Sequence, residues 1–178
     1  MMTLHTGRPE ASEGREAREI AAYDLLDRLG IAYTRVDHAP AATMEDCLAV
    51  EKVLGTAICK NLFLTNRQHT AYYLLLMPGD KPFKTKDLSA QIGSARLSFA
   101  SPEEMERLLG TTPGSASILG LMNDRDREVA LLIDRDLLSA EAIGAHPLVN
   151  TSSLGLRMAD LTGIFLPAVG HTYQTVIL

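Results

Sequence analysis

Residues 56–77 read TAICKNLFLTNRQHTAYYLLLM, and this stretch sets the fold class. Two β-prone apolar runs, 56–64 and 71–77, enclose the polar segment 65–69. A polar segment of this length between two such runs is typical of a hairpin loop. The stretch therefore predicts two neighbouring antiparallel strands.

Outward from the hairpin, helix signals alternate with strand signals. Apolar residues recur every three or four positions in residues 14–29, as on one face of a helix. Thr43 with Asp46, and Ser101 with Glu104, match the capping box that begins helices. The expected helices cover residues 14–29, 43–54, 85–91, 101–109 and 136–143, and the further expected strands cover 31–36, 96–100, 128–133 and 150–157.

The length of 178 residues suits one domain, and no repeat, linker or low-complexity tract divides the chain. Residues 1–12 are polar and aperiodic, so we expect a mobile N-terminal arm there and a single domain over 13–178. We also expect a loose tail after Phe165. The mixture of elements predicts an α+β fold with a mixed, mostly antiparallel sheet or barrel-like core and flanking helices.

The charge balance excludes some partners. Acidic residues number 22 and basic ones 17, a net charge of -5, which disfavours bulk electrostatic binding to DNA.

No apolar run approaches the about 20 residues of a membrane-spanning helix. The N-terminus lacks the apolar region of a secretory signal. We therefore expect a cytoplasmic protein with no membrane or DNA partner.

The residues that usually bind metals are scattered. Cys47 and Cys59 lie twelve positions apart, and the five histidines never occur at the spacing of metal ligands. We expect two reduced thiols, no metal and no cofactor. Aromatic residues make up 5% of the chain and tryptophan is absent, so we expect no large stacking platforms for bases.

Lys60 is the most informative charged residue. On a strand it shares a face with Leu62 and Leu64, among residues of core type. Burying an unpaired ammonium is costly. Either the strand lies at an edge and Lys60 reaches water, or Lys60 lines a pocket and meets an anion or a carbonyl.

Two polar segments further along could hold a ligand. His146 could serve as an acid or base, and Asn150 and Thr151 could hold a water or a sugar hydroxyl, although a capped turn explains the same residues. The loop Gly114-Ser115-Ala116-Ser117 could present N–H groups to an oxyanion. It has neither the Walker lysine nor the Gly-x-Ser-x-Gly pattern of serine hydrolases.

A short basic stretch stands out in this acidic chain. It is formed by Lys81, Lys84, Lys86 and Arg96. Such a stretch is either a solvated face or a contact for a few phosphates.

Three motifs carry a family resemblance: Gly55-Thr56-x-x-Cys59-Lys60-Asn61-Leu62-Phe63-Leu64, Pro113-Gly114-Ser115-x-Ser117 and His146-Pro147-x-x-Asn150-Thr151. In this order and at these separations they resemble the bacterial prolyl-tRNA editing domains, the YbaK/ProX-like deacylases that occur free or inserted in prolyl-tRNA synthetase. The similarity extends from about Ile20 to Phe165. The first helix, the Asp37-His38-Ala39 turn and the stretch 81–86 are most similar to the free-standing subgroup that hydrolyses Ala-tRNA(Pro).

The resemblance implies a hydrolase that clears a wrong amino acid from tRNA(Pro). A hydrophobic pocket rejects a smaller side chain by only about 1 to 3 kcal/mol, so prolyl-tRNA synthetase needs a second, hydrolytic site against alanine. An activated ester requires an oriented water and a stabilised oxyanion more than a strong nucleophile. The expected partners are the acceptor end of mischarged tRNA(Pro) and, transiently, prolyl-tRNA synthetase.

The resemblance also assigns roles to residues. Lys60 would engage the aminoacyl-adenosine end, Asn61 would support the local geometry, and His146 would contact substrate or water. The backbone of Gly114, Ser115, Ala116 and Ser117 would hold the carbonyl or amino group. Asn150 and Thr151 would contact the substrate, and Lys81, Lys84, Lys86 and Arg96 would bind tRNA.

Three other functions fit the same residues. Sibling groups on this scaffold clear cysteine, serine or threonine errors. The chain could also be a catalytically silent module that binds aminoacyl-tRNA or a nucleotide, or an acyl hydrolase of small molecules without an RNA partner.

Overall fold

The computed structural model describes residues 1–41 and 43–178, and it contains the predicted hairpin. Strands β3 (Lys60–Asn66) and β4 (Tyr72–Met77) pair antiparallel, with Lys60 opposite Met77. The first strand begins four residues later than expected. The reason is that segment 57–59 bonds to Gly144 instead, through Gly144 N–H to Ala57 O and Cys59 N–H to Gly144 O.

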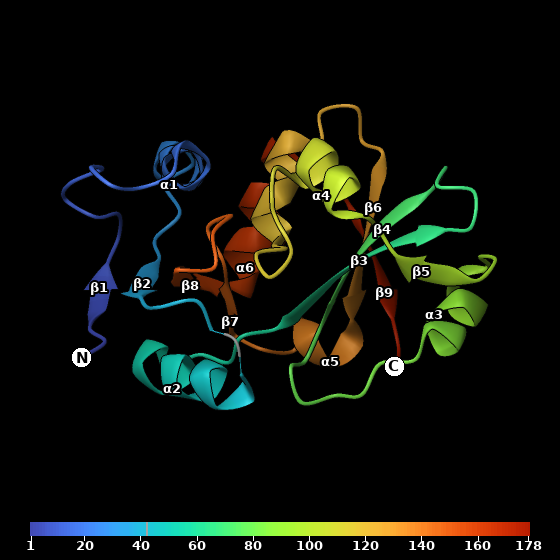
Figure 1. Cartoon of the computed structure of the whole chain (residues 1–178), viewed down its shortest axis with the longest axis horizontal. Coiled ribbons are helices and arrows are strands. Elements are labelled where there is room, and N and C mark those ends of the chain that lie inside the picture. Colours follow the sequence, from blue (N-terminus) through green and yellow to red (C-terminus); the bar gives the residue numbers. More distant parts are fainter. Residues whose placement is uncertain (42) are drawn as a thin grey trace.

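Two sheets form the framework. One has the order β1-β2-β8-β7 and is antiparallel throughout, and the other has the order β5-β3-β4-β6-β9. In the second sheet β4 pairs parallel with β6, and β6 with β9. The remaining strands are β1 (Leu4–Thr6), β2 (Thr34–Asp37), β5 (Leu97–Phe99), β6 (Val129–Asp134), β7 (Ala142–Ala145), β8 (Ser152–Arg157) and β9 (Tyr173–Val176). Figure 1 shows the two sheets side by side along the long axis.

Helices α2 and α4 begin and end where the local signals predict. Thr43 caps α2 and Ser101 caps α4, each within a complete capping box. Gly55 and Gly110 end these helices in the left-handed conformation, with φ of 73° and 63°. The long helices are α1 (Ala17–Arg28), α2 (Met44–Leu54), α3 (Thr85–Ile92) and α4 (Pro102–Leu109). The shorter ones are η1 (Ile118–Asn123), α5 (Arg135–Leu138), α6 (Met158–Asp160), η2 (Leu161–Phe165) and α7 (Leu166–Ala168).

Three segments differ from the sequence analysis. The helix expected over 136–143 ends at Leu138, and β7 follows because pairing with β8 buries Ile143 and Ala145. The tail expected to be loose contains β9, which pairs with β6. Residues 1–12, expected to form a mobile arm, include β1, which pairs with β2. The partner strands of β1 and β9 are distant in sequence, whereas the partner of β7 is the nearby β8. Local propensity does not register either kind of pairing.

The two faces of β3 enter different apolar clusters. Phe63 belongs to the main core between the sheets, whereas Leu64 belongs to a second cluster beneath α3. The fold is therefore α+β with mostly antiparallel pairing, as predicted. Among the described residues, no helix is long and apolar enough to cross a membrane.

Candidate functional site

A cavity of about 440 Å³ lies where the two sheets meet. Its walls come from the turn after β2, helix α2, the start of β3, helix α4, the loop 113–116 and the end of β7. The lining residues with polar or nucleophilic groups are His38, Cys47, Cys59, Asn61, Gly114, His146 and Ser153. Its volume is within the range of about 300–1,000 Å³ typical of small-ligand sites.

His146 lines the cavity, and its Nε2 has no hydrogen-bond partner among the described residues. Its Nδ1 lies 2.8 Å from the backbone carbonyl of Ser152, and because a carbonyl only accepts, Nδ1 carries the proton. Burial lowers the pKa of His146 below its ordinary value of 6.5, and the neighbouring His38 lowers it further. At neutral pH the imidazole is therefore uncharged, with its lone pair on Nε2.

His38 faces the same cavity and was missed as a site residue. Its Nδ1 donates a hydrogen bond to the carbonyl of Ala39 over 2.7 Å, so its Nε2 accepts a hydrogen bond from the hydroxyl of Ser153 over 2.8 Å. The two imidazole rings lie 6.3 Å apart, centroid to centroid. The only sequence signal for His38 was its position in the Asp37-His38-Ala39 turn, which follows β2.

A partly buried charge network contacts Ser152, the residue that holds His146. The hydroxyl of Ser152 donates to Asp37 over 2.9 Å, while the carbonyl of Ser152 accepts from His146. Asp37 also accepts from Arg15 at 2.8 Å and from Arg35 at 3.1 Å. Burial alone would raise the pKa of Asp37, but these bonds outweigh it and hold the pKa well below its usual range.

Asn61 offers an unused acceptor at the cavity wall. Its Nδ2 donates to the carbonyl of Cys59 over 3.2 Å, which fixes the orientation of the amide. Its Oδ1 is buried and has no hydrogen-bond partner among the described residues. Leaving such an atom unpaired costs about 1–3 kcal/mol, so a donor on a ligand is favoured there. Burial raises the pKa of the Cys59 thiol to about 12, which makes it a poor nucleophile.

The loop 111–117 presents backbone to the cavity. Gly114, with φ of 92°, and Ala116 line the cavity. The side chain of Ser115 is buried and bonds to Thr112, and that of Ser117 caps η1. These two hydroxyls shape the loop and do not line the cavity.

Asn150 and Thr151 lie near the cavity without lining it. A Cβ placed on Gly114 would lie 3.7 Å from the Asn150 amide nitrogen, so Asn150 adjoins the loop. Thr151 is exposed, and its carbonyl accepts from the backbone N–H of His38 over 2.9 Å. Neither side chain lines the cavity.

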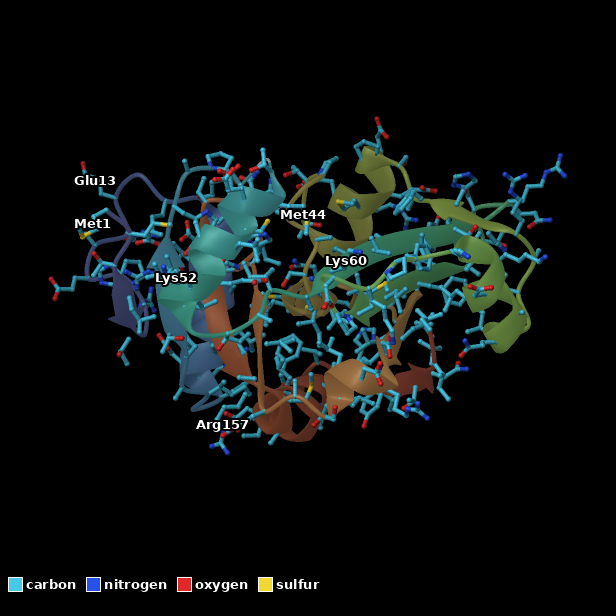
Figure 2. All side chains as sticks on the ribbon, turned by 90° about the horizontal axis from the view of Figure 1, so that it is seen from below. Met1, Glu13, Met44, Lys52, Lys60 and Arg157 are labelled. Carbon is cyan, nitrogen blue, oxygen red and sulfur yellow. The ribbon has the colours of Figure 1, made fainter. Side chains whose placement is uncertain are left out.

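Lys60 is the first residue of β3, between the lining residues Cys59 and Asn61, but it does not itself line the cavity. Figure 2 shows it near the middle of the molecule. Its Nζ donates to the carbonyl of Lys81 over 2.6 Å, on the face of β3 opposite Asn61. No described carboxylate forms an ion pair with it, so its charge is uncompensated at close range. Both alternatives from the sequence are thus met in part: the stem is half-buried, and the ammonium meets a carbonyl of the chain itself.

One residue of the expected basic stretch, Lys81, is already paired with carboxylates. Lys81 forms ion pairs with Asp134 at 2.7 Å and Asp136 at 2.8 Å, so its charge is already neutralised. These hydrogen bonds also raise its pKa. The expectation that Lys81 is open to phosphate is therefore wrong. Lys84, Lys86 and Arg96 are exposed.

No metal-ligating group of three His, Cys, Asp or Glu side chains gathers within residues 1–41 and 43–178. The cavity presents imidazoles, thiols, an amide and backbone groups. An imidazole with a free lone pair can take a proton from water, and backbone N–H groups can stabilise an oxyanion.

Comparison with known proteins agrees with this site. The sequence pattern of the aminoacyl-tRNA editing domain matches residues 38–164. The chain is 33% identical over 153 residues to the prolyl-tRNA editing protein ProX of Acetoanaerobium sticklandii, which covers 86% of this chain and 93% of that protein. It is 32% identical over 155 residues to the prolyl-tRNA synthetase associated domain-containing protein 1 of Mus musculus, covering 83% and 90%.

Solved structures show the same fold. A crystal structure of a proposed trans-editing enzyme for prolyl-tRNA synthetase superposes with a TM-score of 0.68 at 18% identity, covering 92% of this chain and 97% of the other. The matched segment 38–164 contains all the site residues described above. The chain belongs to the family of aminoacyl-tRNA editing domains and is a hydrolase of the aminoacyl-tRNA ester bond.

Proposed function

We propose that this chain acts in trans on mischarged tRNA(Pro), with Ala-tRNA(Pro) as its preferred substrate. One arrangement carries the proposal: His146, with a neutral imidazole, and Asn61, whose buried Oδ1 has no hydrogen-bond partner among the described residues, line the same small cavity. An aminoacyl ester offers a carbonyl for water to attack and an α-ammonium that needs an acceptor. His146 would serve the first group and Asn61 the second.

The hydrolysis follows from these positions. Nε2 of His146 takes a proton from a water whose oxygen forms a bond to the ester carbonyl carbon. The oxyanion that develops is stabilised by the backbone N–H groups of Gly114 and Ala116 and, at longer range, by the charge of Lys60, whose neighbours Cys59 and Asn61 line the cavity. The bond from the carbonyl carbon to the ribose oxygen then breaks, and the imidazolium returns the proton to that oxygen.

A preference for a small amino acid would be set by the walls of the cavity. Its apolar lining residues include Phe63 of β3 and Met105 of α4. A synthetase pocket cannot strongly exclude a smaller side chain, but a second pocket that is too small for proline can exclude the correct product. Alanine would enter such a pocket, whereas the pyrrolidine ring would clash with its walls.

The relatives support the wider setting of this activity. One is called a prolyl-tRNA editing protein and others are named for an association with prolyl-tRNA synthetase. We infer that this chain meets tRNA(Pro) released by that synthetase, with transient contact to the enzyme, in the cytoplasm.

A panel of labelled Ala-, Cys-, Ser-, Thr- and Pro-tRNA(Pro) tests the proposal. The purified protein should release alanine fastest and proline slowest, with unchanged rates when a chelator is present. His146→Ala should abolish most of the release, and His5→Ala, at an exposed position far from the cavity in sequence, is the matched control. Faster release of another amino acid would reassign the substrate, and binding without release would identify a silent module.

A further inference from the structure

One large aromatic side chain stands exposed where the cavity opens. Phe99 lines the cavity and is nevertheless 63% exposed. The other exposed aromatic among the described residues, Tyr173, lies on β9 and outside this cavity. An apolar ring at the edge of a substrate site, with one face bare, is a position where a ligand group can pack.

The fold holds the backbone of Phe99 rigidly while leaving its ring uncovered. Phe99 pairs with Leu64 of β3, and the next residue, Ala100, donates its N–H to Phe63 over 3.0 Å. Leu97, two residues earlier on the same face, is buried beneath Leu88 of α3. Apolar side chains of α3 cover Leu97 on this face of β5, but they do not cover Phe99. Burying a phenylalanine side chain would stabilise the protein by about 1.5–3 kcal/mol, and the exposed ring of Phe99 does not make this contribution.

The charges around Phe99 indicate the kind of ligand. Arg96 is exposed three residues earlier on the same strand segment, roughly 10 Å away at about 3.3 Å per residue. Lys84 and Lys86, at the start of the α3 helix that packs on β5, are exposed too. An aromatic ring flanked by cations, in a protein with a net charge of -5, is the combination that binds single-stranded nucleic acid.

We propose that Phe99 stacks on the adenine of the 3′-terminal nucleoside of tRNA, the base that belongs to the esterified ribose. This inference depends on the proposed function, which places the ester beside His146 and Asn61 within the same cavity. The ribose then lies between the catalytic groups and the opening, and its base emerges at Phe99. Stacking there would hold the ester in register whichever amino acid it carries.

RNA minihelices of the acceptor stem test this directly. One ends in the normal terminal adenosine and the other in an abasic terminal residue, and binding of each is measured at low salt to wild type, Phe99→Ala and Phe99→Trp. The control is Tyr173→Ala. Phe99→Ala should weaken binding of the normal minihelix about 5- to 150-fold, the equivalent of about 1–3 kcal/mol per stacked base, and leave the abasic minihelix unaffected. Phe99→Trp should bind as wild type does.

The outcomes separate this inference from the proposed function. If the wild type deacylates and Phe99→Ala binds both minihelices as well as wild type, the stacking is wrong and the deacylase remains. An equal loss on both minihelices, or a change of oligomeric state in Phe99→Ala, would also overturn it and assign the ring to another contact. If the wild type deacylates nothing but the base-dependent loss is seen, the stacking holds and the proposed function fails.

Discussion

His146 donates its Nδ1–H to the backbone carbonyl of Ser152 over 2.8 Å. This bond fixes both the ring orientation and the tautomer, because only a protonated Nδ1 can bond to a carbonyl. The side chain of the same serine bonds to Asp37, which in turn holds Arg15 and Arg35. The imidazole that we propose as the general base is thus linked through one residue to a charge network outside the cavity.

The first prediction concerns the pH dependence of deacylation. Because only neutral His146 can take a proton from water, the rate should rise with pH through the pKa of His146 and then level off. Burial lowers that pKa, so the midpoint should lie below 6.5. His146→Ala should lower the rate by about 10²–10⁴-fold and remove the pH dependence, as measured by single-turnover deacylation. A midpoint above 6.5 would contradict this assignment.

The second prediction concerns Asp37. Asp37→Ala leaves the buried Arg35 without its carboxylate partner and should lower the free energy of unfolding by about 2–3 kcal/mol. This is less than the about 3–5 kcal/mol of a fully buried pair, because the Asp37 side chain is 34% exposed and solvent screens it. Urea denaturation at pH 7 provides the measurement.

The acid dependence of stability checks the same carboxylate. The pKa of Asp37 is lower in the folded protein than in the unfolded chain, so its contribution is complete above about pH 4, the ordinary value, and is lost as the pH falls further. Between pH 7 and pH 3 the wild type should therefore lose more stability than Asp37→Ala. Equal losses would show that Asp37 is not part of the acid response.

The parts of the fold that depend on neighbours in sequence were predictable. The capping boxes at Thr43 and Ser101 and the hairpin of β3 and β4 are encoded within a few residues. Strands β7 and β9 were not predicted. The partner of β9 is β6, which is distant in sequence, and β7 is a four-residue strand of small and apolar residues that is defined by its pairing with β8. Local pattern alone does not reveal such pairing.

The site was predictable by residue type and only partly by geometry. The motifs correctly placed Asn61, Gly114, Ala116 and His146 at one cavity. Strand alternation predicted which residues share a face of the strand with Lys60, but it does not show which face of the strand meets the cavity. The low aromatic content argued against base stacking, yet composition does not show where a single ring such as Phe99 is left bare.

The third prediction concerns the charge of Lys60. Lys60→Met keeps the stem and removes the ammonium, so packing is preserved while the charge next to the cavity wall is lost. We expect deacylation to fall at least about tenfold, or about 1.4 kcal/mol of transition-state stabilisation. The free energy of unfolding should fall by no more than about 1 kcal/mol, from the lost hydrogen bond to the Lys81 carbonyl. Lys52→Met, at an exposed position on α2, is the control. Full activity in Lys60→Met would reduce the role of Lys60 to holding the Lys81 carbonyl.

The fourth prediction concerns how an acidic protein holds tRNA. With Lys81 neutralised by Asp134 and Asp136, three cations remain in the basic stretch: Lys84, Lys86 and Arg96. Each neutralised phosphate contributes roughly 0.7 to 0.9 to the salt dependence, so the slope of log K against log salt should lie between about -2 and -3.

Charge reversal distinguishes these cations from Lys81. Lys84→Glu with Lys86→Glu should weaken tRNA binding and make the salt slope shallower, while hydrolysis of a short aminoacyl-adenosine mimic, which occupies only the cavity, stays within about twofold of wild type. Lys81→Met should instead lower the free energy of unfolding, because Asp134 is 1% exposed in its side chain and loses its partner, and should leave the salt slope unchanged. Unaltered tRNA binding by the double variant at low salt would show that the stretch is a solvated face and that the phosphates lie against another surface.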